Sequence, residues 1–213
     1  MICTSIAYKS YEECREILSR ETCVELRLDL LDLTPEQVGT LCSLPLITVA
    51  TCREGSYSDE EREILLQTAI KNGAGYVDIE IEMPRKIRKN LVELAKIHQC
   101  RVIISYHHFT RTPELAELKQ FVKKCRKAGA DLVKIACKVN NKDDVAKLLA
   151  LYVYGNSIIA IGMGKEGLIT RLAAPFLGAE FTYASSDRES NTAPGQITGD
   201  EMRRLFEQLG YNL

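Results

Sequence analysis

Residues 24–30 read Val-Glu-Leu-Arg-Leu-Asp-Leu, a strict alternation of apolar and charged side chains. A period of two predicts a β-strand whose two faces meet different surroundings. The apolar set would face covering helices, which leaves Glu25, Arg27 and Asp29 on the opposite face. The stretch therefore predicts a buried strand with an apolar outer side and a charged inner side.

Short β-rich runs of this kind recur along the whole chain, and amphipathic stretches separate them. Strands are expected at 2–7, 22–29, 45–52, 75–81, 101–106, 131–137, 157–163 and 180–184. Helices are expected at about 10–19, 35–43, 58–72, 84–98, 113–128, 141–154, 165–177 and 198–208. Thr34-Pro35 and Thr112-Pro113 have the pattern of an N-cap followed by proline at the first helical position. Regular alternation of strand and helix predicts a parallel sheet.

Eight strand–helix units in 213 residues fit the α/β class and, within it, a (β/α)8 TIM barrel. An open doubly wound sheet is the alternative. No Gly-x-Gly-x-x-Gly turn follows the first expected strand, which disfavours that alternative. No linker or low-complexity stretch divides the chain, so we expect one domain over residues 1–213.

Charged residues fall on the inward face of several expected strands. The same parity places Arg53 inside at the end of the third strand and Asp78 and Glu80 inside on the fourth. Ions buried in this way are costly unless they pair, so a purely structural ion network is one interpretation. The residues nevertheless come from several strands, mostly toward the carboxyl ends, where barrel enzymes build their active sites. That placement favours catalysis.

Lys134 interrupts the otherwise apolar run Leu132-Val-Lys-Ile-Ala136 of the sixth strand. The arginines expected around it favour the neutral amine, whereas Glu25 and Glu80 oppose that. A neutral amine is a nucleophile toward a carbonyl carbon. The sequence therefore predicts an enzyme that forms a Schiff base through Lys134.

Composition excludes several other classes of function. The formal net charge is −1, so no overall field draws the chain to nucleic acid or to a membrane surface. No apolar run approaches the ~20 residues that span a bilayer, and we expect a cytoplasmic protein. The eight cysteines form no Cys-x-x-Cys clip, which predicts buried, reduced thiols. His107 and His108 are adjacent and would point to opposite sides, so we expect no metal and no cofactor.

Further motifs occur in order, each near an expected strand end. They are Glu25-Leu-Arg27-Leu-Asp29, Arg53-Glu54-Gly55, Asp78-Ile-Glu80, Ser105-Tyr-His107-His-Phe109, Ala130-Asp-Leu-Val-Lys134-Ile-Ala, Gly162-Met163-Gly-Lys-Glu-Gly167 with Arg171, and Ala193-Pro-Gly195-Gln196. The set resembles that of the type I 3-dehydroquinate dehydratases of the shikimate pathway. The resemblance covers about nine-tenths of the chain.

The resemblance implies a catalytic role for three residues. Lys134 would form an imine with the ketone of 3-dehydroquinate. His107 would remove the C2 proton and then protonate the departing C1 hydroxyl, giving 3-dehydroshikimate. Glu54 would orient His107.

The resemblance also implies how a small carboxylated cyclic ketone is bound. Arg171 would hold its carboxylate, with Gln196 and Thr192 closing over it. The remaining contacts would come from polar residues at the hydroxyl side of the ring (Glu25, Arg27 and Arg53) and from apolar walls (Met163 and Phe109). The family is commonly homodimeric, which implies the same here.

Two positions depart from the family pattern. The family usually has Asn-His-Asp-Phe where this chain has Tyr106-His-His-Phe109, and Thr192 stands where serine is commoner. The base and the hydroxyl are kept at both places. A class I aldolase or transaldolase remains an alternative, since such enzymes also use a lysine in a barrel. They usually grip a phosphate, however, and an arginine beside a glutamine-bearing loop suits a carboxylate better. A non-catalytic binding protein would not need both Lys134 and His107.

Overall fold

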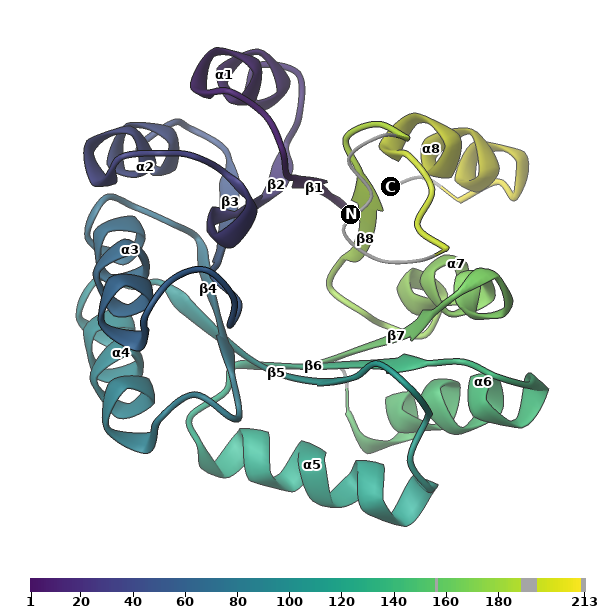
Figure 1. Ribbon diagram of the computed structural model, residues 1–213. Coiled ribbons are helices and arrows are strands. Elements are labelled where there is room, and N and C mark those ends of the chain that lie inside the picture. Colours follow the sequence, from purple (N-terminus) through teal and green to yellow (C-terminus); the bar gives the residue numbers. More distant parts are fainter. Residues whose placement is uncertain (156, 189–194, 212–213) are drawn as a thin grey trace.

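The computed structural model describes residues 1–155, 157–188 and 195–211. Within them, eight strands alternate with eight α-helices (Figure 1). The strands are β1 (Ile2–Ile6), β2 (Cys23–Arg27), β3 (Ile47–Thr51), β4 (Tyr76–Glu80), β5 (Arg101–His108), β6 (Leu132–Lys138), β7 (Ile158–Met163) and β8 (Thr182–Ser185). The helices are α1 (Tyr11–Leu18), α2 (Pro35–Cys42), α3 (Asp59–Lys71), α4 (Arg85–Ile97), α5 (Leu115–Lys127), α6 (Lys142–Leu149), α7 (Leu168–Phe176) and α8 (Gly199–Gln208).

Side-chain caps determine where several helices begin. Ser10, Thr34, Ser58 and Thr198 each accept a hydrogen bond from the third helical residue, whose side chain bonds back to the cap. Such a reciprocal cap satisfies two backbone donors that the helix itself leaves unpaired. The start predicted at Thr112 is wrong, because the Thr112 hydroxyl donates instead to the carbonyl of Lys138 at 2.8 Å. Helix α5 therefore begins two residues later than predicted.

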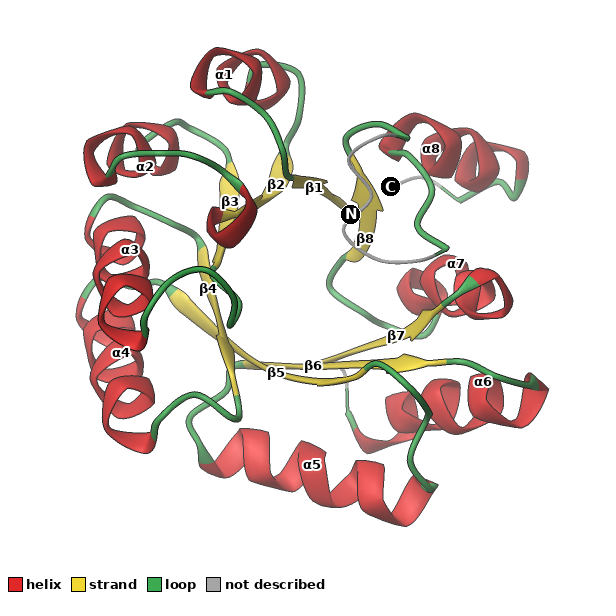
Figure 2. Cartoon of the chain, viewed as in Figure 1, coloured by secondary structure: helices red, strands yellow, loops and turns green. Residues whose placement is uncertain are grey.

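The strands are all parallel and follow one another around a barrel. Their order is β7-β6-β5-β4-β3-β2-β1-β8, and every neighbouring pair is parallel. Figure 2 shows the strands as an inner ring with the helices outside. This confirms the predicted TIM barrel.

Three of the predicted elements give way in part to 3₁₀ segments. Strand β2 ends at Arg27, because residues 28–30 form a 3₁₀ turn, η1 (Leu28–Leu30). Asp29 thus leaves the sheet and turns back to bind the Arg27 guanidinium. The sixth predicted helix divides into α6 and a 3₁₀ segment, η2 (Ala150–Tyr154), and the seventh begins with another, η3 (Lys165–Gly167).

Aromatic rings fill part of the barrel interior between the amino-terminal ends of the strands and the charged residues at their carboxyl ends. There the rings of Tyr76, Phe181 and Tyr183 meet edge to face, with both centroid separations 5.4 Å. This aromatic column closes the amino-terminal end of the barrel interior. All eight cysteines are buried free thiols, as predicted. The charged residues lie above the column, toward the carboxyl ends of the strands.

The barrel has a seam between its two edge strands. No ladder joins β7 to β8 in the residues that the structure describes, and α7 bridges them with side chains. Thr170 accepts from the backbone N–H of Gly162 on β7, while the Thr182 hydroxyl on β8 donates to the Arg171 carbonyl. Helix α7 therefore holds the seam closed.

The seam provides a test of this packing. Thr170→Val keeps the shape of the side chain but leaves the buried N–H of Gly162 without its acceptor. We expect a loss of about 1–3 kcal/mol in the free energy of unfolding, measured by urea denaturation. Thr40→Val is the control, because Thr40 is exposed and donates only within its own helix. Equal effects of the two changes would contradict a special role for the seam.

Candidate active site

A cavity of about 620 Å³ opens at the carboxyl ends of the strands. Every strand, or the loop that directly follows it, contributes to its wall. The lining residues are Ser5, Glu25, Arg27, Asp29, Leu30, Arg53, Glu54, Gly55, Glu80, His107, Phe109, Lys134, Ala136, Ile161, Met163, Arg171, Tyr183 and Gln196.

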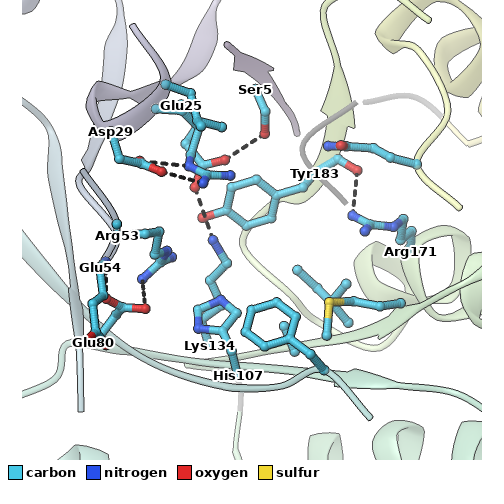
Figure 3. A pocket seen from close by; sticks show the side chains of 18 residues that line it. Ser5, Glu25, Asp29, Arg53, Glu54, Glu80, His107, Lys134, Arg171 and Tyr183 are labelled. Carbon is cyan, nitrogen blue, oxygen red and sulfur yellow. Dashed lines mark hydrogen bonds and ion pairs between the residues drawn. The ribbon is translucent and has the colours of Figure 1, made fainter. Parts of the chain in front are cut away.

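Lys134 lies at the floor of this cavity and is only 5% exposed. Its Nζ atom lies 3.1 Å from Glu25 Oε1 and 3.0 Å from Asp78 Oδ2. The sequence predicted Glu25 and Glu80 as the acids near this lysine. Asp78 takes the second place, because Glu80 lines the cavity farther along, where it binds the Arg62 guanidinium at 2.7 Å. Figure 3 shows Lys134 pointing toward Glu25 and the ring of Tyr183.

The two carboxylates beside Lys134 are themselves held in place. Glu25 accepts from the hydroxyls of Ser5 at 2.6 Å and Thr51 at 3.0 Å. Burial alone would raise the pKa of Glu25, but the positive charges of Lys134 and Arg27 outweigh it and lower the pKa. Both oxygens of this carboxylate are therefore engaged before any ligand arrives.

Asp78 is bound from the other side of the barrel. Arg53 donates to both of its oxygens, at 3.0 and 2.6 Å, and Ser105 donates at 2.5 Å. Burial opposes the charge of Asp78, yet Arg53 and Lys134 hold its pKa well below the usual range. Asp78 is a carboxylate that ties the lysine to Arg53.

His107 lies beside Lys134 and reaches the cavity from β5. Burial, followed by the positive charges of Arg53 and Lys134, lowers the pKa of the imidazole well below its usual range. The ring is therefore neutral at neutral pH and able to accept a proton. His108 points to the other side of the strand, where it packs against Tyr106 and accepts weakly from the backbone of Arg111.

The imidazole of His107 lies beside an aromatic ring. Its Nδ1 is buried and has no hydrogen-bond partner among the described residues. The Phe109 ring lies nearly parallel to it, at 6.0 Å between centroids and 11° between planes. Phe109 lines the mouth of the cavity and is 74% exposed.

Glu54 lies at the rim of the cavity and is exposed. Its backbone N–H donates to Glu80 at 3.2 Å. Within residues 1–155, 157–188 and 195–211, the structure shows no hydrogen bond between Glu54 and His107. The orienting role predicted for Glu54 stays a prediction.

Arg171 is the one cavity-lining cation among the described residues that has no carboxylate within ion-pair distance. Arg27 pairs with Asp29 at 2.6 Å, and Arg53 and Lys134 pair as described above. Arg171 is 2% exposed, and its Nη1 donates to the carbonyl of Tyr183 at 3.2 Å. Its Nε is buried without a partner in the described part of the chain. Burial lowers the pKa of the guanidinium to about 10, so it remains charged at neutral pH.

Gln196 and Met163 complete the wall near Arg171. Gln196 is brought there by Gly195, whose φ of +76° places the chain directly against the backbone of Gly164. A Cβ atom at position 195 would lie 2.2 Å from the Gly164 carbonyl oxygen, so only glycine permits this approach. Thr192 lies outside the described residues.

Among the polar and aromatic residues of the cavity, sequence reasoning missed Ser5 and Tyr183. Both lie on short strands and share the inward face of their neighbours, since Ser5 is in register with Glu25 and Cys3 with Tyr183. Strand parity could have identified them. Neither residue is charged, and the sequence analysis identified inward-facing site residues on the strands by their charge.

The fold and the cavity define an α/β-barrel enzyme built around a buried lysine, a neutral histidine and an arginine that meets no carboxylate among the described residues. A family model, "Type I 3-dehydroquinase", matches residues 2–212. The chain belongs to this family, whose members are hydro-lyases.

Individual relatives agree with this assignment. The chain is 37% identical over 202 residues to a 3-dehydroquinate dehydratase of Methanococcus maripaludis (strain C7), covering 92% of each chain. It is 34% identical to the 3-dehydroquinate dehydratase of Methanocaldococcus jannaschii, and the match covers 98% of this chain and 99% of that protein. The crystal structure of the 3-dehydroquinate dehydratase from Aquifex aeolicus superposes with a TM-score of 0.85 at 30% identity, with both chains fully covered.

The opposite orientations of the two histidines lead to a test. His107→Ala removes a group that faces Lys134, and we expect kcat to fall by about 10²–10⁴-fold, the usual contribution of a general acid or base. His108→Ala alters only the outer face of the strand and should be far milder. Steady-state dehydration of 3-dehydroquinate measures both. Equal losses would show that the inward histidine is not the catalytic one.

Proposed function

We propose that the protein dehydrates 3-dehydroquinate to 3-dehydroshikimate through an imine on Lys134, as the third step of chorismate and aromatic amino acid biosynthesis. The observation that carries the proposal is the buried amine of Lys134 at the floor of the cavity, beside His107. A lysine in this position can attack a ketone that fits the cavity. Membership of the dehydroquinase family supports the substrate.

The first step attaches the substrate to the enzyme. The ammonium of Lys134 gives up one proton, and the free amine adds to the C3 carbonyl. That proton returns to the departing oxygen as water is lost, which leaves a protonated imine. The imine draws electrons from C2, which makes the C2 proton more acidic. The ion pairs with Glu25 and Asp78 hold the nitrogen in place for the attack, because they fix Nζ from two sides.

His107 carries the proton from one site to the other. Its neutral imidazole accepts the C2 proton, and the resulting imidazolium then protonates the departing C1 hydroxyl. The double bond forms between C1 and C2, and water leaves. Hydrolysis of the imine releases 3-dehydroshikimate and restores the amine. A single residue suffices for both transfers, because the proton taken up is the one given back.

The charge balance of the cavity supports an anionic substrate. The buried cations that line the cavity are matched by carboxylates, with Arg171 as the exception in the described part of the chain. An unmatched buried charge is costly, and a bound carboxylate would remove that cost through two parallel hydrogen bonds. Gln196 lies beside Arg171 and would add a contact, and so would Thr192.

The remaining cavity residues would contact the ring of the substrate. Arg27 and Arg53 would bind the hydroxyl groups, with Glu25 contributing through the oxygens that already hold Lys134. Met163 and Phe109 would form the apolar walls. The cavity needs no metal or cofactor for this chemistry, since the imine itself serves as the electron sink.

The homodimer and the cytoplasmic location implied by the family resemblance stay predictions. No helix among the described residues is long and apolar enough to cross a bilayer. Size-exclusion chromatography with light scattering would give the oligomeric state directly.

Covalent trapping tests the imine. Borohydride added with 3-dehydroquinate should reduce the imine and attach the ligand to Lys134, as located by peptide mass spectrometry. Lys134→Ala should fold, lose nearly all activity and trap nothing. Lys138→Ala is the matched control, because this residue lies on the same strand but does not line the cavity. An adduct on any other lysine would refute the assignment.

The carboxylate grip has a separate test. Arg171→Lys keeps the charge but cannot reproduce the two-pronged contact of a guanidinium. We expect KM for 3-dehydroquinate to rise about 10-fold or more, with a smaller effect on kcat. Trapping at saturating substrate should still label Lys134. An unchanged KM would mean that the carboxylate binds elsewhere.

A further inference from the structure

The aromatic ring of Tyr183 lies against the amine of Lys134. The Nζ atom is 4.0 Å from the ring centroid, and Tyr183 is only 2% exposed. Figure 3 shows the ring beside Lys134, with the backbone of Tyr183 toward Arg171. A cation at this distance is attracted by the electron-rich face of the ring, most strongly when both groups are out of water. The nitrogen therefore has three neighbours, namely the ring and the carboxylates of Glu25 and Asp78.

Imine formation changes what these three neighbours can do. An ammonium and a ketone give a protonated imine and one water. The carbon–nitrogen double bond forms, the carbon–oxygen bond breaks, and two protons from the nitrogen leave with the oxygen. The positive charge stays on the nitrogen, but one N–H remains of the original three. Glu25 and Asp78 can no longer both accept a hydrogen bond from Nζ, whereas attraction to the ring needs no N–H.

We propose that the ring of Tyr183 is a positioning residue for the Schiff-base nitrogen, which stabilises its cationic form and shields it from water. The inference rests on the imine mechanism proposed above. The ring is well suited to this role because it cannot turn away. Phe181 packs edge-on against it at 5.4 Å, and Tyr76 packs against Phe181 in the same way.

The hydroxyl of Tyr183 is not required for this role. Its oxygen is buried and forms no hydrogen bond with any other described residue. Burial and the negative charge of Glu25 raise the pKa of the phenol well above its usual range, so the group is neutral and does not act as a base. The function belongs to the face of the ring, which phenylalanine would preserve.

Tyr183 also contacts the other end of the site through its backbone. Its carbonyl oxygen accepts from Arg171 Nη1 at 3.2 Å. A side-chain substitution leaves this carbonyl in place. Changes at position 183 should therefore affect the chemistry at Lys134 more than the binding of the substrate carboxylate. We expect them to lower kcat while KM changes little.

Two substitutions distinguish the ring from the hydroxyl. Tyr183→Leu removes the aromatic face, and we expect kcat and the rate of borohydride trapping by 3-dehydroquinate to fall about 10- to 30-fold. KM should change by less than about threefold, because the Arg171 contact remains. Tyr183→Phe keeps the face, and both rates should stay within about threefold of wild type.

Phe181→Leu is the control for packing. It disturbs the same column without touching Nζ, so its thermal stability should fall while trapping stays near the wild-type rate. If Tyr183→Leu does not fold, Tyr183→Met provides a second aliphatic variant with a more adaptable side chain.

The outcomes separate this inference from the function on which it rests. A wild-type protein that yields no adduct at Lys134 overturns the imine mechanism and the role of Tyr183 with it. A trapping wild type with a fully active, folded Tyr183→Leu overturns the role of the ring alone. Equal losses in Tyr183→Phe and Tyr183→Leu would do the same, since they would assign the effect to the hydroxyl.

Discussion

The ammonium of Lys134 is held between two buried carboxylates, and much of the barrel interior is arranged around this contact. A buried lysine is costly unless its charge is matched, and each matching carboxylate is costly in turn. Glu25 is satisfied by hydroxyls from β1 and β3, and Asp78 by Arg53 and by a serine on β5. The lysine itself comes from β6. The ion pairs thus join strands from most of the barrel, and the same contacts that stabilise its interior fix the reactive nitrogen.

Arg171 shows the opposite arrangement. It sits at the seam between β7 and β8, where no strand ladder brings a neighbour into register. Its carbonyl and one guanidinium nitrogen bond to β8, yet no carboxylate of the described residues meets its charge. Among the described residues, the barrel interior therefore contains a network of paired charges around Lys134 and one cavity-lining cation, Arg171, without a carboxylate partner.

One departure from the family pattern lies next to His107. His108 occupies the position of the family's acid and faces away from the cavity, against Tyr106. Glu54 stands at the rim, and the ring of Phe109 lies nearly parallel to the imidazole of His107. Burial and the positive charges of Arg53 and Lys134 keep the imidazole neutral, which suits a group that must first accept a proton and then return it.

The sequence by itself determined the barrel and the inward face of each strand. Alternation with a period of two leaves Glu25 and Arg27 no other side to occupy, and the interruption of an apolar run by Lys134 marks a buried cation. Most residues expected at the site do line the cavity. The sequence could not give the partners of each charge, because they depend on how strands far apart in the chain are staggered around the barrel. That stagger places Asp78 rather than Glu80 at Lys134 and sets the Tyr183 ring against the nitrogen. It also leaves Arg171 without a carboxylate partner among the described residues. Local periodicity determines which face of a strand each side chain occupies. The distance between side chains on different strands is set only when the strands assemble into the barrel.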